Sequence, residues 1–119
     1  MYRVFYLCLL AMTLSAPALK ANASPLASEA ISRIENGDEP AATYTTIYFY
    51  GLLDGFGLAN AELKERNAQL LFCEPDNINI TAKQASKMLS DFVKKHPALG
   101  KITTDAALLS TLEDAFPCR

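Results

Sequence analysis

Apolar residues recur along most of the chain three and four residues apart, and no segment alternates cleanly between apolar and polar residues. The helical spacing occupies four segments. They run from Ser24 to Asn36, from Pro40 to Arg66, from Thr81 to His96 and from Thr103 to Pro117. The pattern predicts an all-α protein, a small bundle of about four helices in a single domain.

Local signals predict where these helices begin and end. Ser24 is a suitable cap for the first helix, Pro25 is a preferred first helical residue, and Asn36-Gly37-Asp38 predicts its end. Thr81 and Gln84 are spaced as a capping box for the third helix. We expect the fourth helix to be capped by one of the two threonines at 103 and 104.

The second helix carries small residues at intervals of four, at Gly51, Gly55 and Ala59. A glycine inside a helix costs roughly 1 kcal/mol relative to alanine, so a compensating contact is expected. The stripe therefore predicts that a second helix backbone lies close, either within the chain or in a second copy of it. We favour the intramolecular crossing over the homodimer.

The N-terminus has the pattern of an export signal. Arg3 precedes an apolar run from Val4 to Leu14, and Ala21-Asn22-Ala23 is a small-x-small cleavage site. The run is shorter than the ~20 residues that a membrane-spanning helix needs. We therefore expect a cleaved signal peptide at residues 1–23 and a periplasmic domain at residues 24–119, with no membrane association after cleavage.

Composition narrows the range of partners. The chain is 50% hydrophobic and 20% charged, as in compact globular domains, and its net charge is −2. Loss of Arg3 and Lys20 with the signal would make it more acidic. With no basic cluster, the sequence argues against binding to nucleic acid or to an anionic membrane.

Cysteine and histidine limit the chemistry that is available. Cys8 lies in the signal, which leaves Cys73 and Cys118. In an exported domain two cysteines most simply form one disulfide. A catalytic thiol or a zinc site would need a well-placed histidine, and His96 is the only one. The sequence has no nucleophile elbow or phosphate loop, so we expect neither an enzyme nor a metal or other cofactor.

Four short stretches resemble the Rap/Tai family of immunity proteins. They are Tyr48-Phe49-Tyr50-Gly51-Leu52-Leu53-Asp54-Gly55, Phe72-Cys73-Glu74-Pro75, Lys94-Lys95-His96-Pro97 and Ala115-Phe116-Pro117-Cys118. The resemblance covers about Tyr44 to Cys118. It implies a small periplasmic helical protein, commonly dimeric, that neutralises a cell-wall-degrading amidase delivered by type VI secretion. It also implies an intramolecular disulfide between Cys73 and Cys118.

The resemblance implies inhibition by occlusion, in which a rigid element enters the catalytic groove of the toxin. The connection between the third and fourth helices is our candidate for that element. Its residues are His96, Pro97, Ala98, Leu99, Gly100 and Lys101. The main alternative is a periplasmic acid-stress chaperone, since those proteins are also small, helical and linked by one disulfide. Such chaperones dissociate at low pH and expose apolar surface, and the apolar second helix would be that surface.

Overall fold

The computed structural model describes residues 24–36 and 39–119, and in these residues it is helical with no β-strand. The elements are α2 (Ala27–Glu35), α3 (Glu39–Glu65), α4 (Ala82–Lys95), the short 3-10 helix η1 (Pro97–Lys101) and α5 (Thr104–Ala115). The predicted all-α fold with four helices is confirmed. The predicted signal peptide and the Gly37-Asp38 helix end lie outside the described residues.

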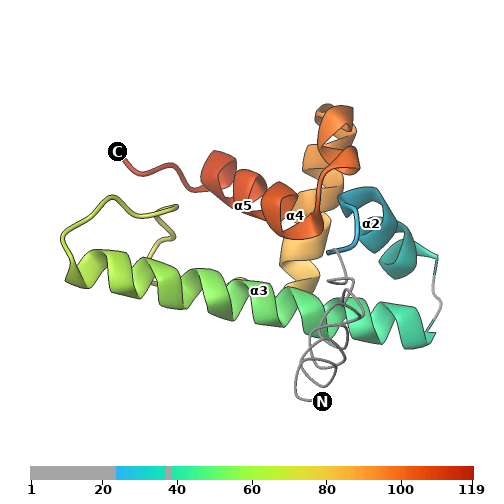
Figure 1. The fold of residues 1–119 in the computed structure, drawn as a ribbon, viewed down its shortest axis with the longest axis horizontal. Helices are drawn as coiled ribbons and strands as arrows, with labels where there is room; N and C mark the ends of the chain where they lie inside the picture. Colours follow the sequence, from blue (N-terminus) through green and yellow to red (C-terminus); the bar gives the residue numbers. More distant parts are fainter. Residues whose placement is uncertain (1–23, 37–38) are drawn as a thin grey trace, which may run out of the picture.

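The long helix α3 runs along one side of the molecule, and the other helices lie above it in the view of Figure 1. Helix α4 crosses α3, and α2 and α5 lie on either side of α4. Helices α2, α4 and α5 all contact one another, while α3 contacts α2 and α4. Only one face of α3 is covered in this arrangement, and Thr45 and Phe49 are its buried residues.

The core is built on alanines where the three shorter helices meet. Ala27 and Ala30 of α2, Ala85 of α4 and Ala107 of α5 are completely buried. Larger side chains fill the space around them, namely Phe49, Phe72, Leu89, Leu108 and Leu112. Because alanine has a single methyl group, it lets helix backbones approach closely. The buried alanines therefore let α2, α4 and α5 pack closely on one another.

Helix α2 begins two residues later than predicted. Its N-cap is Leu26, whose backbone N–H lies 3.4 Å from a carboxylate oxygen of Glu29. Pro25 stays outside the helix because its carbonyl oxygen accepts hydrogen bonds from the backbone N–H and the hydroxyl of Thr104, at 2.9 and 2.7 Å. The expected Ser24 cap is therefore wrong: pairing with the start of α5 takes precedence over the local signal.

The ends of α3 and α4 follow their local sequence. Thr81 and Gln84 form the predicted capping box, with the Gln84 backbone N–H donating to the Thr81 hydroxyl at 3.2 Å. Helix α3 ends at Glu65, and two residues later Asn67 has a positive φ of 52°. The N–H of Ala68 reaches the carbonyl of Leu63 at 2.9 Å, which completes a Schellman-type end.

The 66–81 segment turns back along α3 and is fixed at several points. The predicted disulfide between Cys73 and Cys118 is confirmed, with a Cα–Cα distance of 4.9 Å. Beside it, the Cys73 N–H donates to the Phe116 carbonyl at 2.8 Å. The side-chain amide of Asn60 in α3 donates to the Phe72 carbonyl at 2.9 Å. Its oxygen accepts a hydrogen bond from the Leu71 N–H at 2.8 Å. The segment is thereby linked to both α3 and α5.

Candidate functional site

The hairpin tip, residues His96–Lys101, joins α4 to α5 at the top of the view in Figure 1. The sequence predicted a short connection here, and the structure folds it as η1 against α2 and α4. Gly100 is buried, and a Cβ added to it would lie 3.3 Å from Val93 Cγ1 and 3.5 Å from the Ser28 Cβ. A larger residue at position 100 would crowd Val93, so the tip packs closely on its support.

The same packing divides the candidate toxin-contact residues into two groups. Leu99 is half-buried and Gly100 is buried, so both support the turn. His96, Pro97, Ala98 and Lys101 are exposed. The ring of His96 stands 4.7 Å from that of Phe92, and its carbonyl accepts from the Leu99 N–H at 2.9 Å. The tip thus presents four accessible side chains on a supported turn.

The outer face of α3 is an exposed apolar surface. Tyr44, Ile47 and Leu58 are 76%, 61% and 73% exposed, and they lie on the side of the helix away from the core. Gly51 and Gly55 lie between them. A Cβ added to either glycine would meet nothing within 4 Å. The predicted intramolecular crossing at this stripe is therefore wrong for the described residues, and Ala59 is half-buried at its edge.

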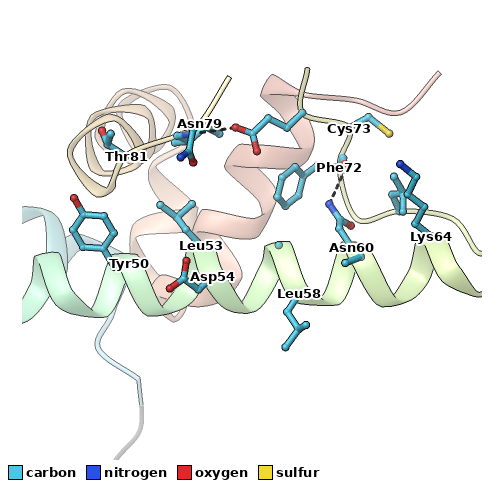
Figure 2. A pocket seen from close by; sticks show the side chains of 15 residues that line it. Tyr50, Leu53, Asp54, Leu58, Asn60, Lys64, Phe72, Cys73, Asn79 and Thr81 are labelled. Atoms are coloured by element: carbon cyan, nitrogen blue, oxygen red, sulfur yellow. Dashed lines mark hydrogen bonds between the residues drawn. The ribbon is translucent and has the colours of Figure 1, made fainter. Parts of the chain in front are cut away.

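A groove of 670 Å³ opens between α3 and the 66–81 segment (Figure 2). Tyr50, Leu53 and Asp54 line it from α3, and Phe72 lines it from the returning segment. Leu58 points away from the labelled residues of the returning segment. Sequence reasoning missed the groove, because it depends on how the segment folds back over a helix that precedes it. Nothing in the sequence near Asn60 indicated that its side chain would be hydrogen bonded to this segment.

Two carboxylates have perturbed pKa values. On the surface of α4, Lys87 donates a hydrogen bond to Asp91 at 2.7 Å, which lowers the pKa of Asp91. At the start of α5, interaction with the Thr103 hydroxyl is the main cause that lowers the pKa of Asp105, and partial burial opposes it. Neither carboxylate lies at the hairpin tip, so these shifts do not indicate general acid or base chemistry there.

The described residues offer exposed surfaces, and their metal-binding and membrane-spanning capacity can be read from the structure. Within residues 24–36 and 39–119 there is no cluster of three or more His, Cys, Asp or Glu that would hold a metal. Cys73 and Cys118 are consumed by the disulfide. None of the helices in this part of the chain is long and apolar enough to cross a membrane.

The structure defines a small helical domain with one disulfide. Comparison with protein families then identifies it further: residues 26–118 match the family model of the Rap1a immunity proteins. Because the match covers most of the chain, this protein belongs to the Rap1a immunity family. The searches found no matching curated protein and no matching solved structure.

Proposed function

We propose that this chain is a periplasmic immunity protein that binds a cell-wall-degrading amidase effector of type VI secretion and blocks its active site. The family match over residues 26–118 is the observation that carries the proposal, since it points to a role in effector immunity. The Cys73–Cys118 disulfide suits an oxidising compartment such as the periplasm. The amidase target is the finer part of the proposal and follows from the resemblance described above.

Blocking a groove requires a protruding element that is already ordered. An inhibitor that must order a loop on binding loses part of its affinity to that cost. The hairpin tip meets this requirement because Gly100 packs on Val93 and Ser28. Its exposed side chains combine small or rigid apolar groups with a cation at Lys101. We propose that this tip enters the catalytic groove of the effector.

The direct test is rescue of a bacterium that carries the effector in its periplasm. Co-expression of the exported chain should prevent lysis, and a version without residues 1–23 should not. Lysis despite folded, oxidised protein in the periplasm would contradict the tested pairing. Acid-triggered binding of an apolar dye would then be measured, because it is the property expected of the alternative chaperone.

The role of the tip is tested by changing only its exposed side chains. The variant Ala98→Glu with Lys101→Glu keeps Leu99 and the buried Gly100, so the turn should still fold. We expect it to lose rescue while its circular dichroism and melting temperature stay near those of the parent. Lys83→Glu, an exposed charge reversal at the start of α4, is the matched control. Full rescue by the tip variant would remove the tip from the contact.

We further propose that the outer face of α3 binds a second copy of the chain. Tyr44 and Leu58 flank Gly51 at equal distances along the helix, seven residues on either side. In an antiparallel pair centred on Gly51, the Tyr44 of each copy would therefore cover the Leu58 of the other. The glycine would let the two backbones approach closely at the centre.

Sedimentation measurements over a range of concentrations test this surface. Leu58→Glu should shift the protein to a monomer, because a charge would lie within the apolar seam. Ile78→Glu places the same charge at a partly exposed isoleucine of the 66–81 segment, outside the seam, and should leave association unchanged. A parent chain that is monomeric at all concentrations would contradict the homodimer.

A further inference from the structure

Residues at the start of the described chain pair with the residues that follow the hairpin tip. Leu26 and Thr103 form an isolated antiparallel bridge. On one side of it, the Ala27 N–H donates to the Ile102 carbonyl at 2.9 Å. On the other side, the Thr104 N–H donates to the Pro25 carbonyl at the same distance. Beyond these bonds, Ser24 precedes Pro25 and Asp105 follows Thr104 in the first turn of α5, and the Ser24 hydroxyl interacts with the Asp105 carboxyl.

Asp105 has an unused acceptor at this position. Its Oδ1 oxygen is buried and has no hydrogen-bond partner among the described residues. The groups that lower the pKa of the carboxyl are hydroxyls and backbone N–H groups, including the hydroxyl of Ser24, and none of them is a cation. A buried carboxylate oxygen left without a partner is costly, so a donor is expected there.

Ser24 itself is held in place. Its hydroxyl is hydrogen bonded to the Tyr48 hydroxyl of α3, and the next residue, Pro25, is fixed by its two bonds from Thr104. The backbone nitrogen of Ser24 therefore belongs to a residue that is itself hydrogen bonded and is followed by a hydrogen-bonded proline. In the uncleaved chain this nitrogen is a neutral amide with one proton.

We propose that removal of the signal peptide after Ala23 creates an α-ammonium group on Ser24 that pairs with the buried oxygen of Asp105 and fastens the mature N-terminus to α5. This inference rests on the proposed export signal. Signal peptidase adds water across the Ala23–Ser24 peptide bond, so a carboxylate forms on Ala23 and an ammonium with three protons forms on Ser24. Cleavage thus supplies the positive charge that the surroundings of Asp105 lack, together with additional donors for its Oδ1 oxygen.

The pair has a defined pH range. Asp105 has a lowered pKa in the folded chain. Its contribution to the free energy of unfolding is therefore fully present above the ordinary carboxyl pKa of about 4, and it is lost as the pH falls through the pKa of the folded state. The paired α-amine would have a raised pKa. Its contribution to the free energy of unfolding would be fully present below the ordinary α-amine pKa of about 8, and it would be lost as the pH rises through the pKa of the folded state. Tyr48 is the other titratable side chain that contacts Ser24.

The experiment compares two N-termini on the domain that begins at Ser24. One form is the exported protein, whose N-terminus is read by mass spectrometry. The other carries one extra glycine before Ser24, which keeps the charge and moves it about 3.8 Å along the chain. At pH 6 we expect the melting temperature to fall by about 4–8 °C in the extended form, the size of effect that a fivefold change in the folding equilibrium has in a domain of this length.

Asp105→Asn completes the test. The extra glycine should have no effect in this variant, because both changes remove the same pair, and the difference between the two N-termini should also vanish at pH 10. Asp114→Asn, an exposed substitution at the end of the same helix, should preserve the full effect of the glycine. Additive effects of the glycine and Asp105→Asn, or a mature N-terminus at another residue, would overturn the pairing. Failure of rescue with the pairing intact would contradict only the proposed immunity role.

Discussion

Replacing Gly51 and Gly55 by alanine should stabilise the monomeric chain. Each glycine lies inside α3, where it costs about 0.8–1 kcal/mol relative to alanine. Neither has a positive φ, and an added Cβ would meet nothing within 4 Å, so no strain offsets the gain. The double variant should gain about 2 kcal/mol in its free energy of unfolding, and its melting temperature should rise by about 8–16 °C.

Urea unfolding followed by circular dichroism measures this gain, and it is repeated from low to high protein concentration. Gly100→Ala is the matched control, because the same substitution there brings a Cβ to 3.3 Å from Val93. We expect Gly100→Ala to cost about 1–3 kcal/mol through overpacking. Opposite signs for the same chemical change would show that the surroundings of the glycine decide the outcome.

Concentration dependence separates the monomer from the proposed homodimer. If two copies pack on Gly51 and Gly55, the alanine variant gains stability when dilute and associates more weakly when concentrated. A loss of stability that does not depend on concentration would refute the reasoning, because it would mean that another part of the same chain lies against the stripe.

Four other substitutions test the contacts that hold the fold. Asn60→Ala removes two hydrogen bonds to the returning segment and should cost about 1–3 kcal/mol in urea unfolding, whereas Asn79→Ala in the same groove should cost far less. Replacing both disulfide cysteines by serine should lower the free energy of unfolding by about 4 kcal/mol, since the bridge joins residues 45 apart. At Asn67, with its φ of 52°, valine should cost at least 1 kcal/mol and glycine should be tolerated, as thermal melts would reveal. The carboxyl of Asp91 has a lowered pKa in the folded chain, so it stabilises the fold above the pKa of the unfolded chain and stops doing so on acidification. Asp91→Asn should therefore reduce the loss of stability that occurs below about pH 4 in low salt.

Helices and their ends were predictable where the determining contacts are local. The box formed by Thr81 and Gln84 spans four residues and is present as expected. Ser24 and Pro25 are an equally good local start signal, yet α2 begins after them. The difference is that Pro25 has a partner 79 residues away, at Thr104. A local cap cannot reveal a competing contact of that kind.

The binding surfaces were only partly predictable for the same reason. The glycines in α3 indicated a face of the helix with small side chains, but the sequence could not show whether another part of the chain packs against that face. Gly100 was expected in a simple connection, whereas the structure places it under the side chain of Val93. The sequence pattern distinguishes apolar from polar faces well, and it does not tell which apolar face remains uncovered after folding.

The hairpin tip is held by contacts near it and not by the disulfide. Cys118 lies beyond the far end of α5, about 18 Å of helix away from the tip. The nearer support comes from Ser28 of α2 under Gly100 and from the pairing of Ala27 with Ile102, directly after the tip. Loss of the disulfide should therefore lower stability and loosen the groove, yet spare inhibition at temperatures where the chain stays folded. Loosening residues 24–27 should instead affect the tip itself.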